Sequence, residues 1–166
     1  MDIYQAILDW VHLLGTVTWI GGTIFYVLIL TPSLGVLEPP QAGKLMGALV
    51  KRYALFAWGA IVLLIVSGIL IASGRNVTLF KGTAGMLLGI KHIVVACMIV
   101  IGAIVGRVIG PKLAALAKPP NGAQPTTPAG PNPQAAKLRK TAGTLGVVNL
   151  LFGIAVLALT ALAGWA

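Results

Sequence analysis

The chain consists of four long apolar stretches joined by polar connections. The apolar stretches cover residues 4–30, 53–73, 84–109 and 141–164. Each is long enough to cross the hydrocarbon core of a bilayer, which takes about 20 helical residues. A barrel strand would be about half as long and would alternate polar with apolar positions. The pattern therefore predicts an all-α membrane protein, a bundle of four transmembrane helices.

The composition indicates the same class of protein. Of the 166 residues, 58% are hydrophobic and 9% are charged, and the mean hydropathy is +0.97. A soluble domain carries about 25% charged residues, so this chain has too few to cover a water-facing surface. The length suits one membrane domain over residues 1–166. We expect an integral protein of a bacterial or archaeal plasma membrane, with the lipid bilayer as its main partner.

Basic residues are distributed unevenly among the connections. Nine cations lie between residues 31 and 52 or between 107 and 140, whereas the connection after the second stretch carries only Arg75 and Lys81. By the positive-inside rule, the two basic connections face the cytoplasm and both termini lie on the outer side. The net charge of +9 then follows from topology and from contact with anionic lipid heads, and no nucleic-acid partner is expected.

The connection before the last stretch has a composition of its own. Residues 118–136 are rich in proline, glycine and small polar side chains. Such a segment buries too little apolar area to compensate the entropy of ordering it. The sequence therefore predicts a flexible cytoplasmic linker over 118–136.

The chain has two histidines, and each lies about nine residues into an apolar stretch. His12 belongs to the first stretch and His92 to the third, and these two stretches cross the membrane in the same direction. Measured from the outer side, the two depths differ by about one residue, or roughly 1.5 Å of helix rise. Two imidazoles at one height inside a bundle suit the axial positions of a haem iron. The sequence predicts haem b between the first and third helices, with both histidines as iron ligands.

Other residues near this depth suit the same cofactor. Gly15 shares a helix face with the first histidine, and Gly68 has a comparable depth in the second helix; glycine lets a backbone or a flat macrocycle approach closely. Arg75 at the outer rim is expected to pair with a haem propionate. Lys91 is expected to pair with a propionate, with Asp9 or with a substrate anion. The alternative is ordinary helix packing for the glycines and a lysine that snorkels to the outer boundary.

Two sets of motifs lie in the first and third stretches and together cover less than half of the chain. The first stretch contains His12-x6-Trp19-Ile20-Gly21-Gly22, then Phe25 and Thr31-Pro32-Ser33-Leu34. The third contains Gly85-Met86-Leu87-Leu88-Gly89-Ile90-Lys91, then Gly106-Arg107 and Pro111-Lys112-Leu113. Together these motifs resemble the copper-resistance D (CopD) domain family, and the resemblance implies copper binding or transport across the membrane. Copper(I) prefers thiolate and thioether ligands and also accepts imidazole, and the candidate ligands within the apolar stretches are His12, His92, Cys97, Met86 and Met98.

The resemblance extends to the HemJ type of protoporphyrinogen oxidase. In that enzyme a histidine of the first helix ligates haem and a lysine of a later helix is essential; by position these match His12 and Lys91. The sequence departs from the enzyme after Pro32, where an arginine and aromatic residues are expected and residues 33–35 are Ser, Leu and Gly. An activity like that of this oxidase is therefore the second alternative, behind copper.

The function expected from the residues is electron transfer or redox chemistry at haem b, with a quinone or a small oxidant as partner. An enzyme of this kind would be an oxidoreductase, because three carboxylates in the whole chain leave no pair for acid–base hydrolysis. The sequence assigns no catalytic residue. It also leaves the oligomeric state open, a homodimer included.

Overall fold

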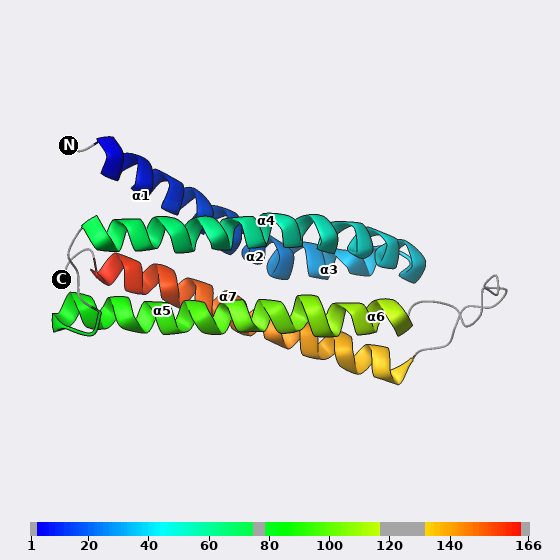
Figure 1. The fold of residues 1–166 in the computed structure, drawn as a ribbon. Coiled ribbons are helices and arrows are strands. Elements are labelled where there is room, and N and C mark those ends of the chain that lie inside the picture. Colours follow the sequence, from blue (N-terminus) through cyan, green and yellow to red (C-terminus); the bar gives the residue numbers. More distant parts are fainter. Residues whose placement is uncertain (1–2, 75–78, 117–131, 164–166) are drawn as a thin grey trace.

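The structure, a computed structural model, describes residues 3–74, 79–116 and 132–163. These residues contain four helical segments that are long and apolar enough to span a membrane: Ile3–Val36, Gln41–Gly74, Gly85–Leu116 and Pro133–Leu162. No strand occurs among the described residues. The predicted bundle of four transmembrane helices is therefore confirmed (Figure 1).

Each helix continues beyond its apolar stretch. The first span comprises α1 (Ile3–Thr16), π-helical η1 (Val17–Gly21), α2 (Gly22–Ile24), π-helical η2 (Phe25–Leu30), α3 (Thr31–Ser33) and η3 (Leu34–Val36). The others are α4 (Pro39–Gly74), then α5 (Gly82–Ala103) with π-helical η4 (Ile104–Ile109) and α6 (Gly110–Leu116), and finally α7 (Pro133–Ala163). Residues 133–136 of the predicted linker are thus helical, and its residues 118–131 lie outside the described part of the chain.

The first span widens into π-helix before Pro32. Proline has no backbone N–H, so the turn that precedes it loses one helical hydrogen bond. In η2 the hydroxyl of Thr31 donates to the carbonyl of Tyr26 at 2.8 Å, and the backbone N–H of Thr31 donates to the same oxygen. This five-residue spacing is that of a π-turn, a geometry that is frequent at functional sites.

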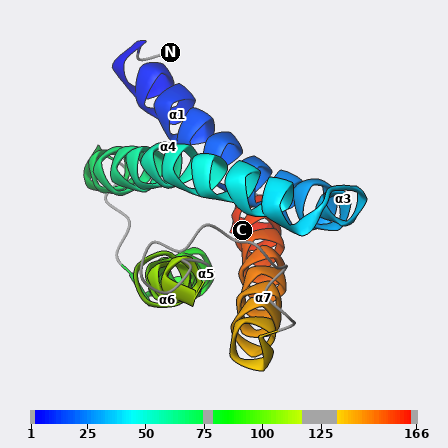
Figure 2. The ribbon, with the colours of Figure 1, turned by 90° about the vertical axis from the view of Figure 1, so that its right-hand side faces the viewer.

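The spans form two antiparallel pairs, α1 with α4 and α5 with α7. The α1–α4 pair is close because Gly15 has no side chain: a Cβ atom there would lie 3.0 Å from Cγ of Leu64 and 3.3 Å from the carbonyl oxygen of Ala60. Small residues commonly permit such approach between membrane helices. Figures 1 and 2 both show the N-terminal end of α1 leading away from α5.

The two pairs join in the middle of the bundle, where α7 contacts η1, α2 and η2. A Cβ atom at Gly153 of α7 would lie 3.4 Å from Cγ2 of Ile20 and 3.5 Å from Cε of Met98. The buried core around this contact consists of Trp19, Ala60, Ile61, Met98 and Val156. All four spans therefore contribute to one core.

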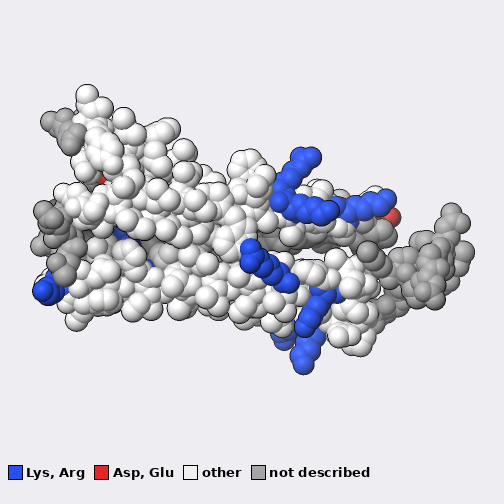
Figure 3. All heavy atoms as spheres, in the orientation of Figure 1, with Lys and Arg blue, Asp and Glu red and all other residues white. Residues whose placement is uncertain are grey.

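Most of the described cations gather in one half of the molecule (Figure 3). We call it the basic half; its cations are Lys44, Lys51, Arg52, Arg107, Lys112, Lys137, Arg139 and Lys140. Outside the basic half, Lys81 directly precedes α5 and Lys91 lies within it, while Arg75 and Lys118 lie outside the described residues. The helices thus bring the connections expected in the cytoplasm to one end; which side of the membrane that end faces stays a prediction.

Candidate functional site

The imidazole of His12 is held between α1 and α4 by a buried serine. Its Nδ1 atom lies 2.8 Å from Oγ of Ser67, which is 2% exposed. The Ser67 hydroxyl donates its hydrogen to the carbonyl oxygen of Leu63 at 2.6 Å. The same hydroxyl therefore accepts from His12, and Nδ1 carries the imidazole hydrogen. The lone pair of Nε2 is left for a ligand.

The two glycines expected near a cofactor are used by helix packing. A Cβ atom at Gly68 would lie 3.4 Å from Cε1 of His12, so this glycine of α4 makes room for the imidazole. Gly15 is closed off by Leu64 and the Ala60 carbonyl, as described above. These distances match the packing alternative, and contact of either glycine with a macrocycle has no support from them.

His92 has the same protonation pattern without a second helix to hold it. Its Nδ1 atom lies 2.7 Å from the carbonyl oxygen of Leu88 on the same helix, α5. A carbonyl only accepts, so Nδ1 is the donor and Nε2 again carries the lone pair. Metal-binding histidines usually donate their other N–H to an acceptor of this kind. The ring of His92 is exposed, whereas that of His12 is half-buried.

The two histidines lie on different helix pairs, within the range over which their charges interact. His92, Lys91 and Asp9 are all close enough to act electrostatically on the imidazole of His12. His12 belongs to the α1–α4 pair, while Lys91 and His92 belong to the α5–α7 pair. The candidate site is therefore shared between the two helix pairs, and both signs of charge flank it.

Comparison with known families identifies the chain. The sequence model of the family described as copper resistance protein D (CopD) matches residues 47–163. The chain belongs to the CopD family. The match includes Ser67, Lys91 and His92 and begins after the first span, so the first-helix motif and His12 lie outside it. No similar curated protein and no similar solved structure was found. The kinship with HemJ-type oxidases stays a prediction.

The sulfur atoms of this CopD-family chain do not gather around the histidines. Met98 is 1% exposed and lies in the core, where its methyl group faces Gly153. Met86 is 54% exposed, and Cys97 lies on the surface of the bundle. No group of three or more His, Cys, Asp or Glu side chains suited to a metal ion occurs in the described ranges.

A polar cluster in the first two spans was not predicted. The hydroxyl of Thr23 donates to the carbonyl of Trp19 at 2.9 Å and accepts from the hydroxyl of Tyr53 at 3.1 Å. The ring of Tyr53 stacks on that of Tyr26, with 5.7 Å between centroids, and occupies the space in front of Gly22. Tyr26 lies on the same helix face as His12. Its stacking partner, Tyr53, is known only from the pairing of α4 with the first span.

Proposed function

We propose that this CopD-family protein binds copper(I) between His12 and His92 and passes it across the membrane. The observation that carries the proposal is the pair of imidazoles within the range over which their charges interact, each with Nδ1–H engaged and Nε2 available. Membership of the copper resistance family favours copper over haem b as the ligand. The finer roles of the residues below belong to the same proposal.

Copper(I) suits two imidazole ligands. Imidazole is among the ligands that copper accepts, and the ion tolerates low coordination numbers. The hydrogen bonds at both Nδ1 atoms fix the tautomer and make Nε2 more basic. With Nδ1 as the donor, each ring presents Nε2 to a metal ion.

The charges beside the site suit an ion that is released again. Lys91 repels a cation near His12, and Asp9 attracts one. A transported ion must bind well enough to enter and weakly enough to leave. A site with two protein ligands and a neighbouring ammonium group binds a cation more weakly than a permanent metal centre with more ligands. Such a site therefore suits an ion that must leave again.

The two histidines have different parts in this proposal. His12 is fixed by Ser67 across the α1–α4 contact, so it is the stationary ligand. His92 is exposed and bonded only to the Leu88 carbonyl of its own helix, so its ring can turn once that single bond breaks. Copper bound by both rings would connect the two helix pairs. It would leave the site after the His92 ring dissociates from it.

Copper(I) titration of the purified full chain tests the proposal. Under reducing conditions, a chromogenic copper(I) chelator competes with the wild-type protein and with His12→Ala, His92→Ala and Met86→Leu. We expect one ion per wild-type chain, loss of that ion in either histidine variant, and no change in Met86→Leu. Uptake of copper(I) into proteoliposomes should fall in the same two variants. If both histidine variants bound copper(I) as tightly as the wild type, copper would not bind at this site.

Haem b is the second candidate, favoured by the equal depth of the two histidines. The same two Nε2 atoms would be its axial ligands, and bound haem would supply electron transfer with a quinone or small oxidant. An absorption spectrum of the dithionite-reduced protein separates the candidates. A low-spin haem spectrum that disappears in His12→Ala and in His92→Ala would replace copper by haem.

A further inference from the structure

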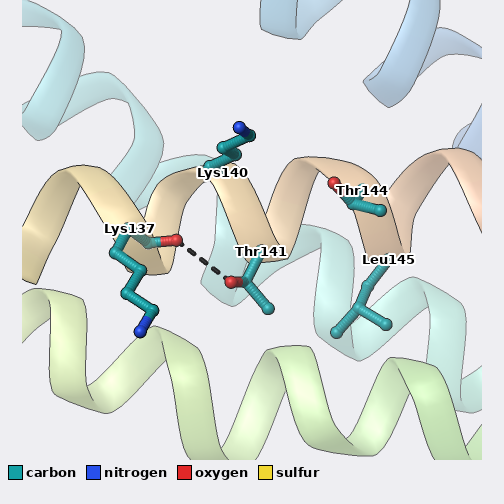
Figure 4. Close-up of a pocket in the computed structure, with 5 residues that line it drawn as sticks. All are labelled: Lys137, Lys140, Thr141, Thr144 and Leu145. Carbon is teal, nitrogen blue, oxygen red and sulfur yellow. Dashed lines mark hydrogen bonds between the residues drawn. The ribbon is translucent and has the colours of Figure 1, made fainter.

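The basic half contains a recess on the surface of α7, with a volume of about 430 Å³. Its lining residues are Lys137, Lys140, Thr141, Thr144 and Leu145. Figure 4 shows the two lysine side chains leaving α7 on opposite sides of the view, with the two threonines further along the helix. The recess lies within a membrane-spanning helix, Pro133–Leu162, near the end where the cations gather.

The positive charge at the recess is not neutralised by the residues that line it. No acidic side chain is among the residues that line the recess. Eight cations share the basic half with Glu38. An anionic ligand would find its counter-charge here, and the leaflet around α7 supplies anionic headgroups.

The lining changes character along α7 in the order in which a phospholipid does. Lys137 and Lys140 come first, then the hydroxyl groups of Thr141 and Thr144, then the apolar side chain of Leu145. A phospholipid passes in the same order from phosphate to the ester-bearing glycerol and then to the acyl chain. A soluble anion would use only the first of these three layers.

The threonine hydroxyls have room for this ligand. The Thr141 hydroxyl donates to the carbonyl of Lys137 at 3.0 Å, so its oxygen still accepts. The Thr144 hydroxyl has no hydrogen-bond partner among the residues that the structure describes. It is the donor available to a phosphate or ester oxygen.

We propose that this recess is a binding site for one anionic phospholipid: the long side chains of Lys137 and Lys140, three residues apart on α7, turn toward its phosphate from either side, with Thr144 on the glycerol region and Leu145 on the acyl chain. The lipid site is separate from the candidate copper site, and neither depends on the other. A lipid bound in the recess would anchor the start of α7 in the surrounding leaflet. The segments α6 and η4 also contact α7.

Native mass spectrometry of the full chain in detergent tests the lipid site. We expect phosphatidylglycerol to bind more tightly than phosphatidylcholine, and this preference to fall as salt is added. Each lysine near an anionic headgroup contributes about fivefold, so Lys137→Gln with Lys140→Gln should weaken phosphatidylglycerol binding by about 25-fold. The matched control is Lys44→Gln with Lys51→Gln, an equal change in charge at exposed positions of α4; it should leave the preference intact.

Three results would overturn the assignment. Equal losses in the two double variants would mean that the charge acts diffusely over the basic half. Competition by inorganic phosphate at the same concentration as the lipid would identify a soluble anion as the ligand. A wild-type preference that does not respond to salt would exclude the lysines even if the double variant fails to fold. Leu145→Asn completes the test, because it should weaken lipid binding and leave the charge unchanged.

Discussion

The 2.8 Å bond between Nδ1 of His12 and Oγ of Ser67 joins α1 to α4 at the candidate site. Ser67 passes its own hydrogen to the Leu63 carbonyl, so the serine orients the imidazole without touching a ligand at Nε2. It is a positioning residue. Its effect on copper is therefore indirect and acts through the direction and basicity of the His12 ring.

Replacing this serine should weaken copper binding while the protein stays folded. Loss of such a supporting bond typically costs about 10- to 100-fold in metal affinity, and we expect a loss in this range for Ser67→Ala in the copper(I) competition assay. The control is Ser73→Ala, which removes an exposed α4 hydroxyl that bonds only to Leu70 of its own helix. Unchanged affinity in Ser67→Ala, with His12 still required, would show that the bond has no role in positioning.

Two adjacent glycines of the first span should respond in opposite ways to alanine. A Cβ atom at Gly22 would lie 2.8 Å from Cε2 of Tyr53, whereas a Cβ atom at Gly21 meets nothing within 4 Å. Gly22→Ala must push the tyrosine off Thr23 and Tyr26, at a cost of about 1–3 kcal/mol. Gly21→Ala gains helix propensity, up to about 1 kcal/mol. Thermal unfolding in detergent measures both; equal midpoints would contradict the close contact.

The sequence predicts the helices of this protein better than their ends. The hydrophobic pattern marks where the chain meets lipid, but a helix needs only its backbone hydrogen bonds to continue into water. The fourth helix accordingly begins at Pro133, eight residues before its apolar stretch. The π-helical segments of the first span carry no such pattern, since they depend on individual backbone hydrogen bonds, such as the one that Pro32 cannot donate.

For the candidate site, too, the sequence predicts some features and not others. Equal depth in the bilayer is a property of position along the chain, so His12 and His92 were predicted together from sequence. The partner of each imidazole depends on helix rotation and pairing, which sequence position does not determine. Gly15 and Gly68 illustrate this: their size predicts a close approach, and the structure shows that α4 and the His12 ring occupy those spaces.

Met98 should act as a core residue and not as a copper ligand. It is 1% exposed and packs with Trp19 and Val156. Met98→Ala should therefore lower the free energy of unfolding by about 2–5 kcal/mol, while Met98→Leu, which keeps the volume, should cost less than about 1.5 kcal/mol. We expect Met98→Leu to bind copper(I) as tightly as the wild type. A marked loss of copper in this variant would place the thioether among the ligands.

The orientation of the bundle is testable at described positions. In a Cys97→Ser background, Gln134→Cys at the start of α7 should react with a membrane-impermeant maleimide only after the cytoplasmic side is opened. Thr83→Cys at the start of α5 should react from outside in intact cells. Both side chains are exposed, so access depends on the side of the membrane. The reverse pattern would place the candidate site in the cytoplasmic half.

Lys91 should weaken copper binding and speed its release. The ammonium group is half-buried and close enough to act on His12, where repulsion of a bound cation is poorly screened by solvent. Lys91→Met keeps most of the side-chain volume and removes the charge, so copper affinity should rise by several-fold while uptake into proteoliposomes slows. Lys81→Met, at an exposed position near the start of α5, should change neither quantity. If Lys91→Met instead lowers the affinity, the lysine assists binding, as expected where copper enters with an anionic ligand that the ammonium group holds.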